Sequence, residues 1–267
     1  MSNLFQKFYS QNKFLLVIVV PVILLSLWLL ASVYLTSQAE RIIFNNQVSW
    51  APIPAYGYKL DFVKNSRGEN LSFWFFENEY SDEVILYLHG NTGRLAHFFP
   101  ELIKKANILS PAYPGYHESE GKPSVDSVYE TAFLAYEWLV QKKGFPENKI
   151  TILGHSLGGS PAIYLASKKP QAKQLVLINT FSSIQSLCFR QYSILCVFSG
   201  SIFNSAEQAK EVLLPVRHFA YSGDLDIPFE ENQKLFQFFT KSKDKKFFVL
   251  SGYTHAYPNF DQILPEI

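Results

Sequence analysis

The chain has 267 residues, a length that suits one sizeable domain with an appendage. Its 24 Lys and Arg residues balance 23 Asp and Glu residues, so the formal net charge is +1 at pH 7. This balance excludes a net field that would attract nucleic acid or acidic polymers, and no nucleic-acid partner is predicted. Two cysteines, Cys188 and Cys196, are too few for a disulfide framework or a zinc site. Either they pair outside the cytosol or they are two small buried side chains.

The first predicted element is an apolar helix over residues 14–35, where 22 positions carry no charge. As a helix this segment slightly exceeds the roughly 30 Å hydrocarbon core of a bilayer. A cleavable signal peptide is the alternative, because Lys7 and Lys13 precede the segment and residues 37–39 resemble a cleavage site. The length of the apolar stretch favours an uncleaved signal anchor.

The charges that flank this segment predict its orientation. Lys7 and Lys13 lie upstream with no acidic residue, whereas Arg41 is accompanied by Glu40 downstream. The positive-inside rule therefore places the N-terminus in the cytosol and the rest of the chain on the far side of a single-pass membrane segment. The predicted organisation is a tail at 1–13, the anchor at 14–35, a linker at 36–57 and one domain at 58–267.

Short apolar runs, each of the length of a strand, follow one another along the domain. Residues 58–63 and 71–76 are separated by a turn signal and predict an antiparallel hairpin. Further strands are predicted at 84–88, 108–112, 150–153, 175–178, 216–221 and 247–250.

Helical patterns alternate with these strands. The clearest is at 124–143, where apolar residues recur every three or four positions and Gly144 closes the run. This alternation predicts an α/β domain with a mostly parallel central sheet flanked by helices. The segment at about 182–215 breaks it and predicts a small cap over the carboxyl ends of the strands. The cap's many apolar residues form either an acyl pocket or lid, or only the cap's own packing.

The sequence Gly154-His-Ser-Leu-Gly158 lies between a predicted strand and a predicted helix. In the α/β-hydrolase fold this Gly-x-Ser-x-Gly turn lifts a nucleophilic serine clear of the sheet, and the glycines remove side chains that would clash. Ser156 is therefore the predicted nucleophile. His155, inside the turn, faces the wrong way to act as its base and is assigned to local packing.

An oxyanion hole is predicted from backbone N–H groups next to Ser156. The strand at 84–88 leads into His89-Gly-Asn-Thr-Gly93, the place where this fold supplies one donor. We predict the N–H groups of Asn91 and Leu157 as the donors. A phosphate-binding loop is excluded because no Lys-Ser or Lys-Thr follows at the required spacing.

The acid and the base follow in the chain order of this fold, which is Ser, then Asp or Glu, then His. Two carboxylates, Asp224 and Asp226, lie after the strand at 216–221, and His255 lies after the strand at 247–250. We predict His255 as the base and Asp226 as the acid, with Asp224 as the alternative acid. His97, His117 and His218 are assigned no catalytic role. No metal or organic cofactor is predicted.

Five segments carry a resemblance to the membrane-anchored α/β-hydrolase-domain serine hydrolases with a small cap. They are LYLHGN at 86–91, YPGYHESEGKPS at 113–124, GHSLGG at 154–159, NTFSSI at 179–184 and SGDLD at 222–226. In these relatives the acid is usually the third residue after the glycine, which is Asp226 here. Ile227 and Pro228 follow one residue early, which keeps Asp224 as the alternative.

The resemblance implies hydrolysis of carboxylic esters or thioesters of acyl or lipid-like substrates through an acyl-enzyme. The expected partners are a small-molecule acyl substrate and the membrane. Two other functions remain open at this point: a serine peptidase of the same fold, and a non-catalytic, membrane-tethered binding module.

Overall fold

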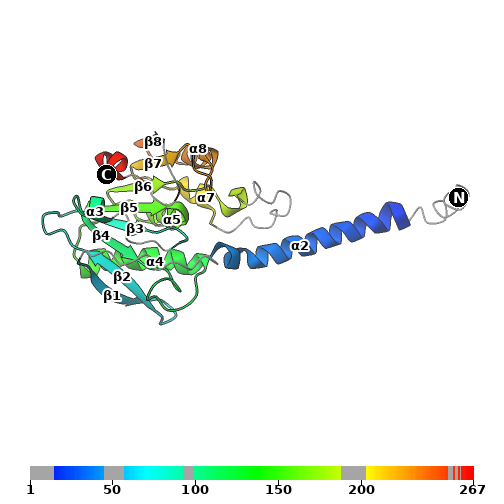
Figure 1. Ribbon diagram of the computed structural model, residues 1–267, viewed down its shortest axis with the longest axis horizontal. Helices are drawn as coiled ribbons and strands as arrows, with labels where there is room; N and C mark the ends of the chain where they lie inside the picture. The colour runs from blue at the N-terminus through cyan, green and yellow to red at the C-terminus, as the bar shows by residue number, and fades with distance from the viewer. Residues whose placement is uncertain are drawn as a thin grey trace, which may run out of the picture.

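The computed structural model describes residues 15–44, 57–92, 99–187, 203–251, 255, 258 and 260–267. The domain is built on one eight-stranded sheet with the order β1-β2-β4-β3-β5-β6-β7-β8 (Figure 1). The strands are β1 (Lys59–Lys64), β2 (Asn70–Phe76), β3 (Val84–Leu88), β4 (Asn107–Pro111), β5 (Ile150–His155), β6 (Gln174–Ile178), β7 (Val216–Tyr221) and β8 (Lys245–Leu250). β2 pairs antiparallel with β1 and β4, and the other neighbours pair parallel. The predicted hairpin and mostly parallel sheet are confirmed.

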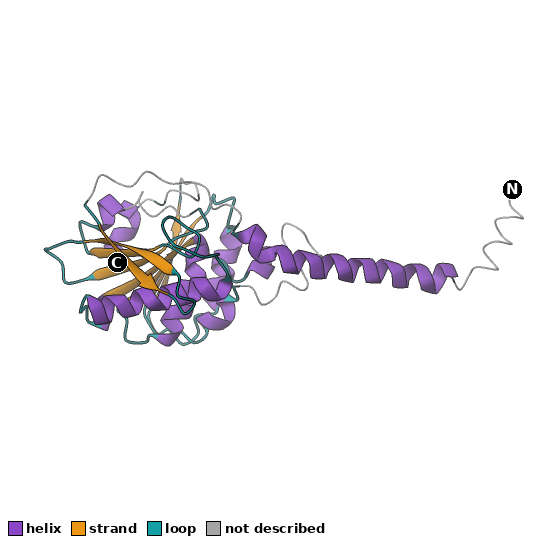
Figure 2. Cartoon of the chain, turned by 90° about the horizontal axis from the view of Figure 1, so that it is seen from below, coloured by secondary structure: helices purple, strands orange, loops and turns teal. Residues whose placement is uncertain are grey.

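Helices cover the sheet on both sides (Figure 2). The described helices of the domain are α3 (Phe99–Leu102), α4 (Val125–Glu137), α5 (Gly159–Lys168), α7 (Ser205–Ala209), α8 (Phe229–Gln237) and α9 (Phe260–Ile263). α4, α5, α7 and α8 contact one another in that order, and α3 contacts α9. Because both faces are covered, every residue of β3, β4, β5 and β6 is buried. This burial is why apolar residues predominate in these strands.

The predicted helix at 124–143 is α4 followed by a π-helical turn, η2 (Trp138–Lys142). It begins with a reciprocal cap, in which the Ser127 N–H donates to Ser124 Oγ and the Ser124 N–H donates to Ser127 Oγ. Gly144 ends it at φ +76°, a left-handed conformation that glycine adopts without strain. The predicted end of the helix at Gly144 is confirmed.

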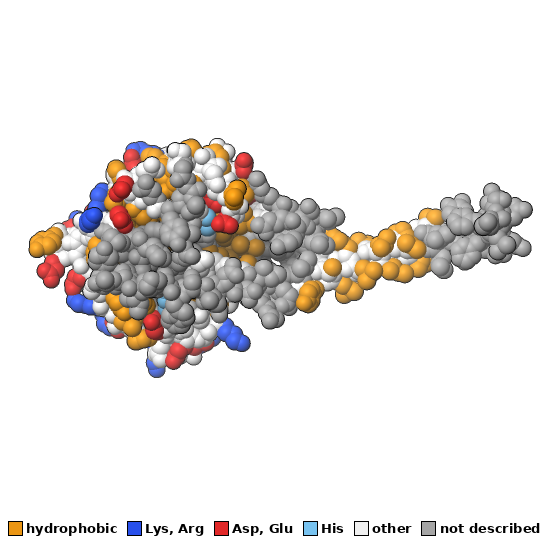
Figure 3. Space-filling view, in the orientation of Figure 1, with side chains coloured by type: hydrophobic (Ala, Val, Ile, Leu, Met, Phe, Trp, Pro, Cys, Tyr) orange, Lys and Arg blue, Asp and Glu red, His pale blue; other side chains and the backbone are white. Residues whose placement is uncertain are grey.

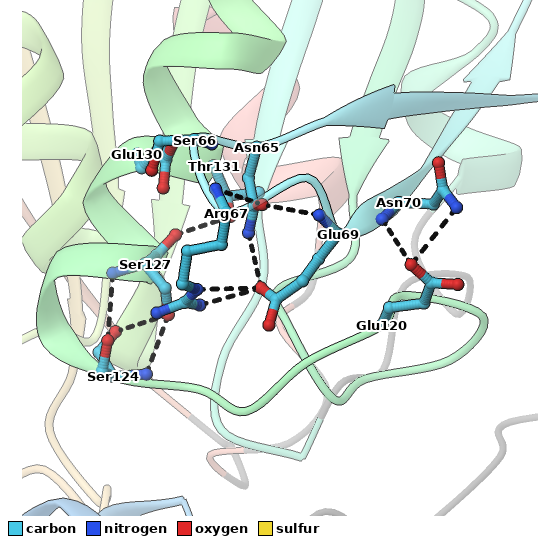
Figure 4. A network of polar contacts seen from close by, with 10 residues as sticks. All are labelled: Asn65, Ser66, Arg67, Glu69, Asn70, Glu120, Ser124, Ser127, Glu130 and Thr131. Atoms are coloured by element: carbon cyan, nitrogen blue, oxygen red, sulfur yellow. Dashed lines mark hydrogen bonds and ion pairs between the residues drawn. The ribbon is translucent and has the colours of Figure 1, made fainter.

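A polar network holds the β1–β2 turn against the loop that precedes α4 (Figure 4). Asn65 Oδ1 accepts the N–H groups of Arg67 and Glu69, which closes the turn. The N–H of Asn70 donates to Glu120, across 50 positions of sequence. These bonds, with the backbone bond from Glu120 to Asn70, fix the loop at 113–124 in place.

The N-terminal apolar segment is helical and projects away from the domain (Figure 1). A π-helical turn, η1 (Leu15–Val19), leads into α2 (Val20–Ile43). The window Val17–Tyr34 has a mean hydropathy of 2.5, and its side chains are largely exposed, as the apolar surface in Figure 3 shows. By length and composition this helix can cross a membrane. It continues to Ile43, so residues 36–43 of the predicted linker are helical.

The middle of the predicted cap, residues 188–202 with both cysteines, lies outside the described residues. The described start of the cap is attached to α8. Ser182 and Ser186 each donate a hydroxyl hydrogen bond to the carboxylate of Glu231, at 2.8 and 2.5 Å. Glu231 is largely buried, and the two bonds compensate part of the cost of removing its carboxylate from water.

Candidate active site

Ser156 lies in the sharp turn between β5 and α5. Its φ of +55° is a left-handed conformation, which costs a residue other than glycine about 1–3 kcal/mol. The turn places Ser156 at the start of a helical turn, η4 (Ser156–Gly158), that continues into α5. Backbone strain at this position is the mark of a nucleophile elbow, in which the hydroxyl is raised above the end of the strand.

The glycines around Ser156 are required because the backbone segments touch. A Cβ on Gly154 would lie 2.5 Å from the carbonyl oxygen of Gly158, and one on Gly158 would lie 2.0 Å from that of Leu88. A Cβ on Gly159 would lie 2.1 Å from Thr180 Oγ1. No side chain fits at these separations, so the Gly-x-Ser-x-Gly-Gly pattern is a packing requirement of the elbow.

The side chains of Ser156, His255 and Asp224 form a hydrogen-bonded chain. The Ser156 hydroxyl donates to His255 Nε2 at 2.7 Å, and His255 Nδ1 donates to Asp224 Oδ2 at 2.7 Å. The three residues follow the carboxyl ends of β5, β7 and β8. These strands are parallel, so their carboxyl ends lie on the same side of the sheet. This is the geometry of a serine, histidine and carboxylate triad.

The carboxylate that contacts His255 is Asp224, so the preference for Asp226 is corrected. The reason is the turn after β7. Asp224 Oδ1 accepts the N–H groups of Asp226 and Ile227, both at 2.9 Å, which turns the Asp224 side chain inward and buries it. Asp226 lies two residues further along this turn and is exposed.

The loop after β3 lies against Ser156, as the predicted oxyanion hole requires. A Cβ on Gly90 would lie 3.2 Å from the Ser156 Cβ. His89 Nδ1 donates to the Gly90 carbonyl at 2.8 Å, and since the peptide is trans, the Asn91 N–H points the opposite way. The Leu157 N–H is in the first turn of a helix, where it has no acceptor within that helix.

Two aromatic residues of the segment at 113–124 support this loop. Tyr116 donates its hydroxyl to Asn91 Oδ1 at 2.9 Å. Tyr113 packs its ring 4.0 Å from the ring of His89, centroid to centroid. Burial lowers the pKa of His89 to about 3, so its ring is neutral and donates only from Nδ1. The segment at 113–124 was noted for its resemblance to known hydrolases, but no role in supporting the loop after β3 was predicted for it.

His155 has a larger role than local packing. It is buried beside Ser156, and its Nε2 donates to the backbone carbonyl of His255 at 3.0 Å. Burial is the main cause that lowers its pKa, to about 3, so the ring is neutral. His155 thereby fixes the backbone that carries His255, which is a contact between residues 100 positions apart.

A second buried network supports the turn that carries Ser156. Thr180 Oγ1 donates to the Ser156 carbonyl at 2.8 Å, and the Thr180 N–H donates to Asn232 Oδ1 at 2.9 Å. The same Asn232 oxygen accepts His218 Nε2 at 3.0 Å. His218 lies inside β7, where burial lowers its pKa to about 4. These contacts connect the elbow, β7 and α8.

Ligand atoms of Asp224, Asp226 and His255 lie within 4.8 Å of one another. Both ring nitrogens of His255 are already used, one by Asp224 and one by Ser156. A metal ion here would have to displace one of these hydrogen bonds. Of the other histidines, His117 contacts the Trp74 ring, and His97 lies outside the described residues.

Comparison with known proteins agrees with this fold. A protein-family profile described as "alpha/beta hydrolase fold" matches residues 83–191. Protein bem46 of Schizosaccharomyces pombe is 30% identical over 67% of this chain and 63% of its own length. The lysophosphatidylserine lipase ABHD12 of Macaca fascicularis is 25% identical over 82% of this chain and 61% of its own length. The chain therefore spans less than two thirds of these curated relatives.

Solved structures give the same architecture at lower identity. An esterase of Pyrococcus furiosus superposes with a TM-score of 0.63 at 18% identity, covering 82% of this chain and 90% of the esterase. An alpha-beta hydrolase from Vibrio vulnificus superposes with a TM-score of 0.66 at 21% identity, covering 79% of this chain and 81% of that protein. From its sheet order, its nucleophile elbow and these comparisons, the chain has the α/β-hydrolase fold.

Proposed function

We propose that the chain is a serine hydrolase that cleaves carboxylic ester or thioester bonds of acyl or lipid-like substrates. The observation that carries the proposal is the continuous hydrogen-bonded chain from Ser156 Oγ through His255 to Asp224, with 2.7 Å at each contact. The relatives and structural neighbours include a lysophosphatidylserine lipase and esterases, which supports an ester substrate with an acyl chain.

In the proposed mechanism, His255 Nε2 takes the proton of Ser156 Oγ as this oxygen attacks the acyl carbon. The N–H groups of Asn91 and Leu157 donate to the oxyanion that forms. When the intermediate collapses, His255 returns the proton to the leaving alcohol or thiol, and an acyl-enzyme remains on Ser156. Water, deprotonated by His255, then attacks the acyl carbon and releases the acid, and the proton returns to Ser156.

We also propose that α2 anchors the enzyme in a membrane. The exposed apolar window Val17–Tyr34 supports a single span. The lysines at 7 and 13 support a cytosolic N-terminus, with residues 58–267 and the cap at 182–215 on the far side.

The test is labelling of the full chain by a fluorophosphonate probe, together with hydrolysis of p-nitrophenyl esters of increasing acyl length. Wild type should be labelled and should turn over esters, and Ser156→Ala should do neither. The preferred acyl length gives the size of the acyl site. No labelling of folded wild type would favour a membrane-tethered binding module. Cleavage of peptides with no ester turnover would favour a peptidase.

A further inference from the structure

The end of α2 is packed onto the domain. Phe44, directly after the helix, is 4% exposed, and its ring lies 6.0 Å from that of Phe203 in an edge-to-face contact. Phe203 is fully buried and lies 5.8 Å from the ring of Tyr129 on α4. Tyr129 stacks on Tyr164 at 4.4 Å and is hydrogen bonded to Ser160 at 3.1 Å. The last two residues belong to α5, so an aromatic contact chain joins the apolar helix to the helix that follows the nucleophile.

This contact chain lies at the carboxyl edge of the sheet, the edge that holds the catalytic residues. Ser160 is in the first turn of α5, four positions after Ser156. Tyr129 is in the early part of α4, which follows the loop from the end of β4. Phe203 belongs to the cap at 182–215, which follows β6 (Gln174–Ile178). In Figure 1, α2 leaves the domain on the side where α5 and α7 lie, away from α3 and the C-terminus.

The length of helix between the apolar window and the domain is short. The window ends at Tyr34, and the helix continues unbroken to Ile43. At about 1.5 Å per residue, the ten positions from Tyr34 to Phe44 span about 15 Å. The interfacial layer of one leaflet takes about 5–7 Å of that distance. With the helix along the bilayer normal, Phe44 therefore lies about 8–10 Å beyond the interfacial layer, and the carboxyl edge against which it packs faces the bilayer at short range.

The same edge presents an exposed apolar side chain at the triad. Leu225, between Asp224 and Asp226, is 94% exposed. A leucine side chain exposed on this edge can bury its apolar surface when the edge meets a bilayer. At the opposite edge, Tyr80 in the loop before β3 is 99% exposed and serves as a reference position far from the triad.

We propose that the docked Phe44 holds the catalytic edge toward the bilayer, and that the enzyme takes a lipid ester laterally from the leaflet nearest the domain, with Leu225 in contact with that surface. This inference rests on the proposed ester hydrolysis and membrane anchoring, and it adds the source of the substrate and the residues that orient the domain.

The first test uses the full chain reconstituted in phosphatidylcholine vesicles. Two rates are measured on each sample: hydrolysis of a fluorogenic long-chain acyl ester dissolved in the vesicles, and hydrolysis of water-soluble p-nitrophenyl acetate. Phe44→Ala and Leu225→Asp should each lower the ratio of the first rate to the second by about tenfold, because the productive encounter with the bilayer is lost. The matched variants Phe62→Ala, on the β1 edge strand, and Tyr80→Asp should keep the ratio of wild type. An unchanged ratio in both Phe44→Ala and Leu225→Asp would overturn the proposal.

The second test needs no enzyme activity, so it separates this proposal from the proposed function. The background is the full chain with Cys188→Ser and Cys196→Ser. A spin label is attached to the single cysteine introduced by Leu225→Cys or by Tyr80→Cys. In vesicles, the label at 225 should be accessible to oxygen and protected from a water-soluble nickel relaxant, and the label at 80 should show the reverse. Phe44→Ala should make the label at 225 accessible to nickel. Equal aqueous accessibility of both labels in the wild-type background would overturn the proposal, even if esters are hydrolysed.

Discussion

Oδ2 of Asp224 lies 2.7 Å from Nδ1 of His255, while Oδ1 of the same carboxylate accepts two N–H groups of its own loop. Both oxygens of Asp224 are thus fixed, and the side chain is buried. A carboxylate held in this way keeps the histidine in the tautomer whose Nε2 can accept the serine proton. Asp226, two residues away, is exposed and is held in place by its N–H bond to Asp224.

The first prediction follows from this division of roles. Asp224→Asn should lower kcat for p-nitrophenyl esters by about 10³ to 10⁴, because the amide favours the wrong histidine tautomer. Asp226→Asn should change kcat by less than about threefold, because an exposed charge is screened. Fluorophosphonate labelling rates of the two variants should follow the same order. If Asp226→Asn were the more damaging substitution, Asp226 would be the acid.

Local sequence patterns predicted the sheet and the sharp glycine-flanked turn at Ser156 for clear physical reasons. Strands buried on both faces are rich in apolar residues. In the elbow, a Cβ on Gly154 or Gly158 would lie less than 3 Å from other atoms, so only glycine fits two positions before and after Ser156. The choice between Asp224 and Asp226 depended on the direction of one side chain in a turn, which spacing in relatives does not determine. Residues 36–43 were not predicted to be helical because they lack the apolar pattern of the span.

The contacts that support the site could not be predicted from the sequence. His155 meets the His255 backbone across 100 positions, and Thr180 meets Asn232 across 52. Such pairs depend on which strands become neighbours and on how the loops cross the sheet edge. The motif at 179–184 marked Thr180, but only the folded chain shows that its hydroxyl bonds the Ser156 carbonyl.

The second prediction concerns His155 as a positioning residue. His155→Phe removes the donor to the His255 backbone while keeping a ring, and it should lower kcat about tenfold with little change in KM, since the base is less well positioned. His155→Gln can still donate from its amide and should recover part of kcat. Steady-state kinetics on p-nitrophenyl butyrate would measure both. A rise in KM alone would mean that His155 shapes the substrate site instead.

The third prediction concerns Thr180. Thr180→Val removes the hydroxyl and leaves the buried Ser156 carbonyl without this donor, which should cost about 1–3 kcal/mol of unfolding free energy. Thr180→Ser keeps the hydroxyl and should cost less than Thr180→Val. Denaturant unfolding of the full chain in detergent would compare the two variants. Equal losses would show that the methyl group, packed near Gly159, matters more than the hydrogen bond.

The fourth prediction is a dependence of stability on pH from three buried histidines. Burial lowers the pKa of His89 and His155 to about 3 and that of His218 to about 4. In the unfolded chain their pKa is about 6.5, so below this pH the unfolded state binds more protons than the folded state. With respect to these histidines, the unfolding free energy is therefore highest above about pH 6.5. It should fall as the pH drops toward about 4, by up to about 1.4 kcal/mol per pH unit for each histidine. His218→Gln, which retains a donor for Asn232, should reduce the slope by about one proton. Unfolding measured at several pH values and constant ionic strength tests this, and a flat profile between about pH 6.5 and 4.5 would show that these rings are protonated in the folded chain.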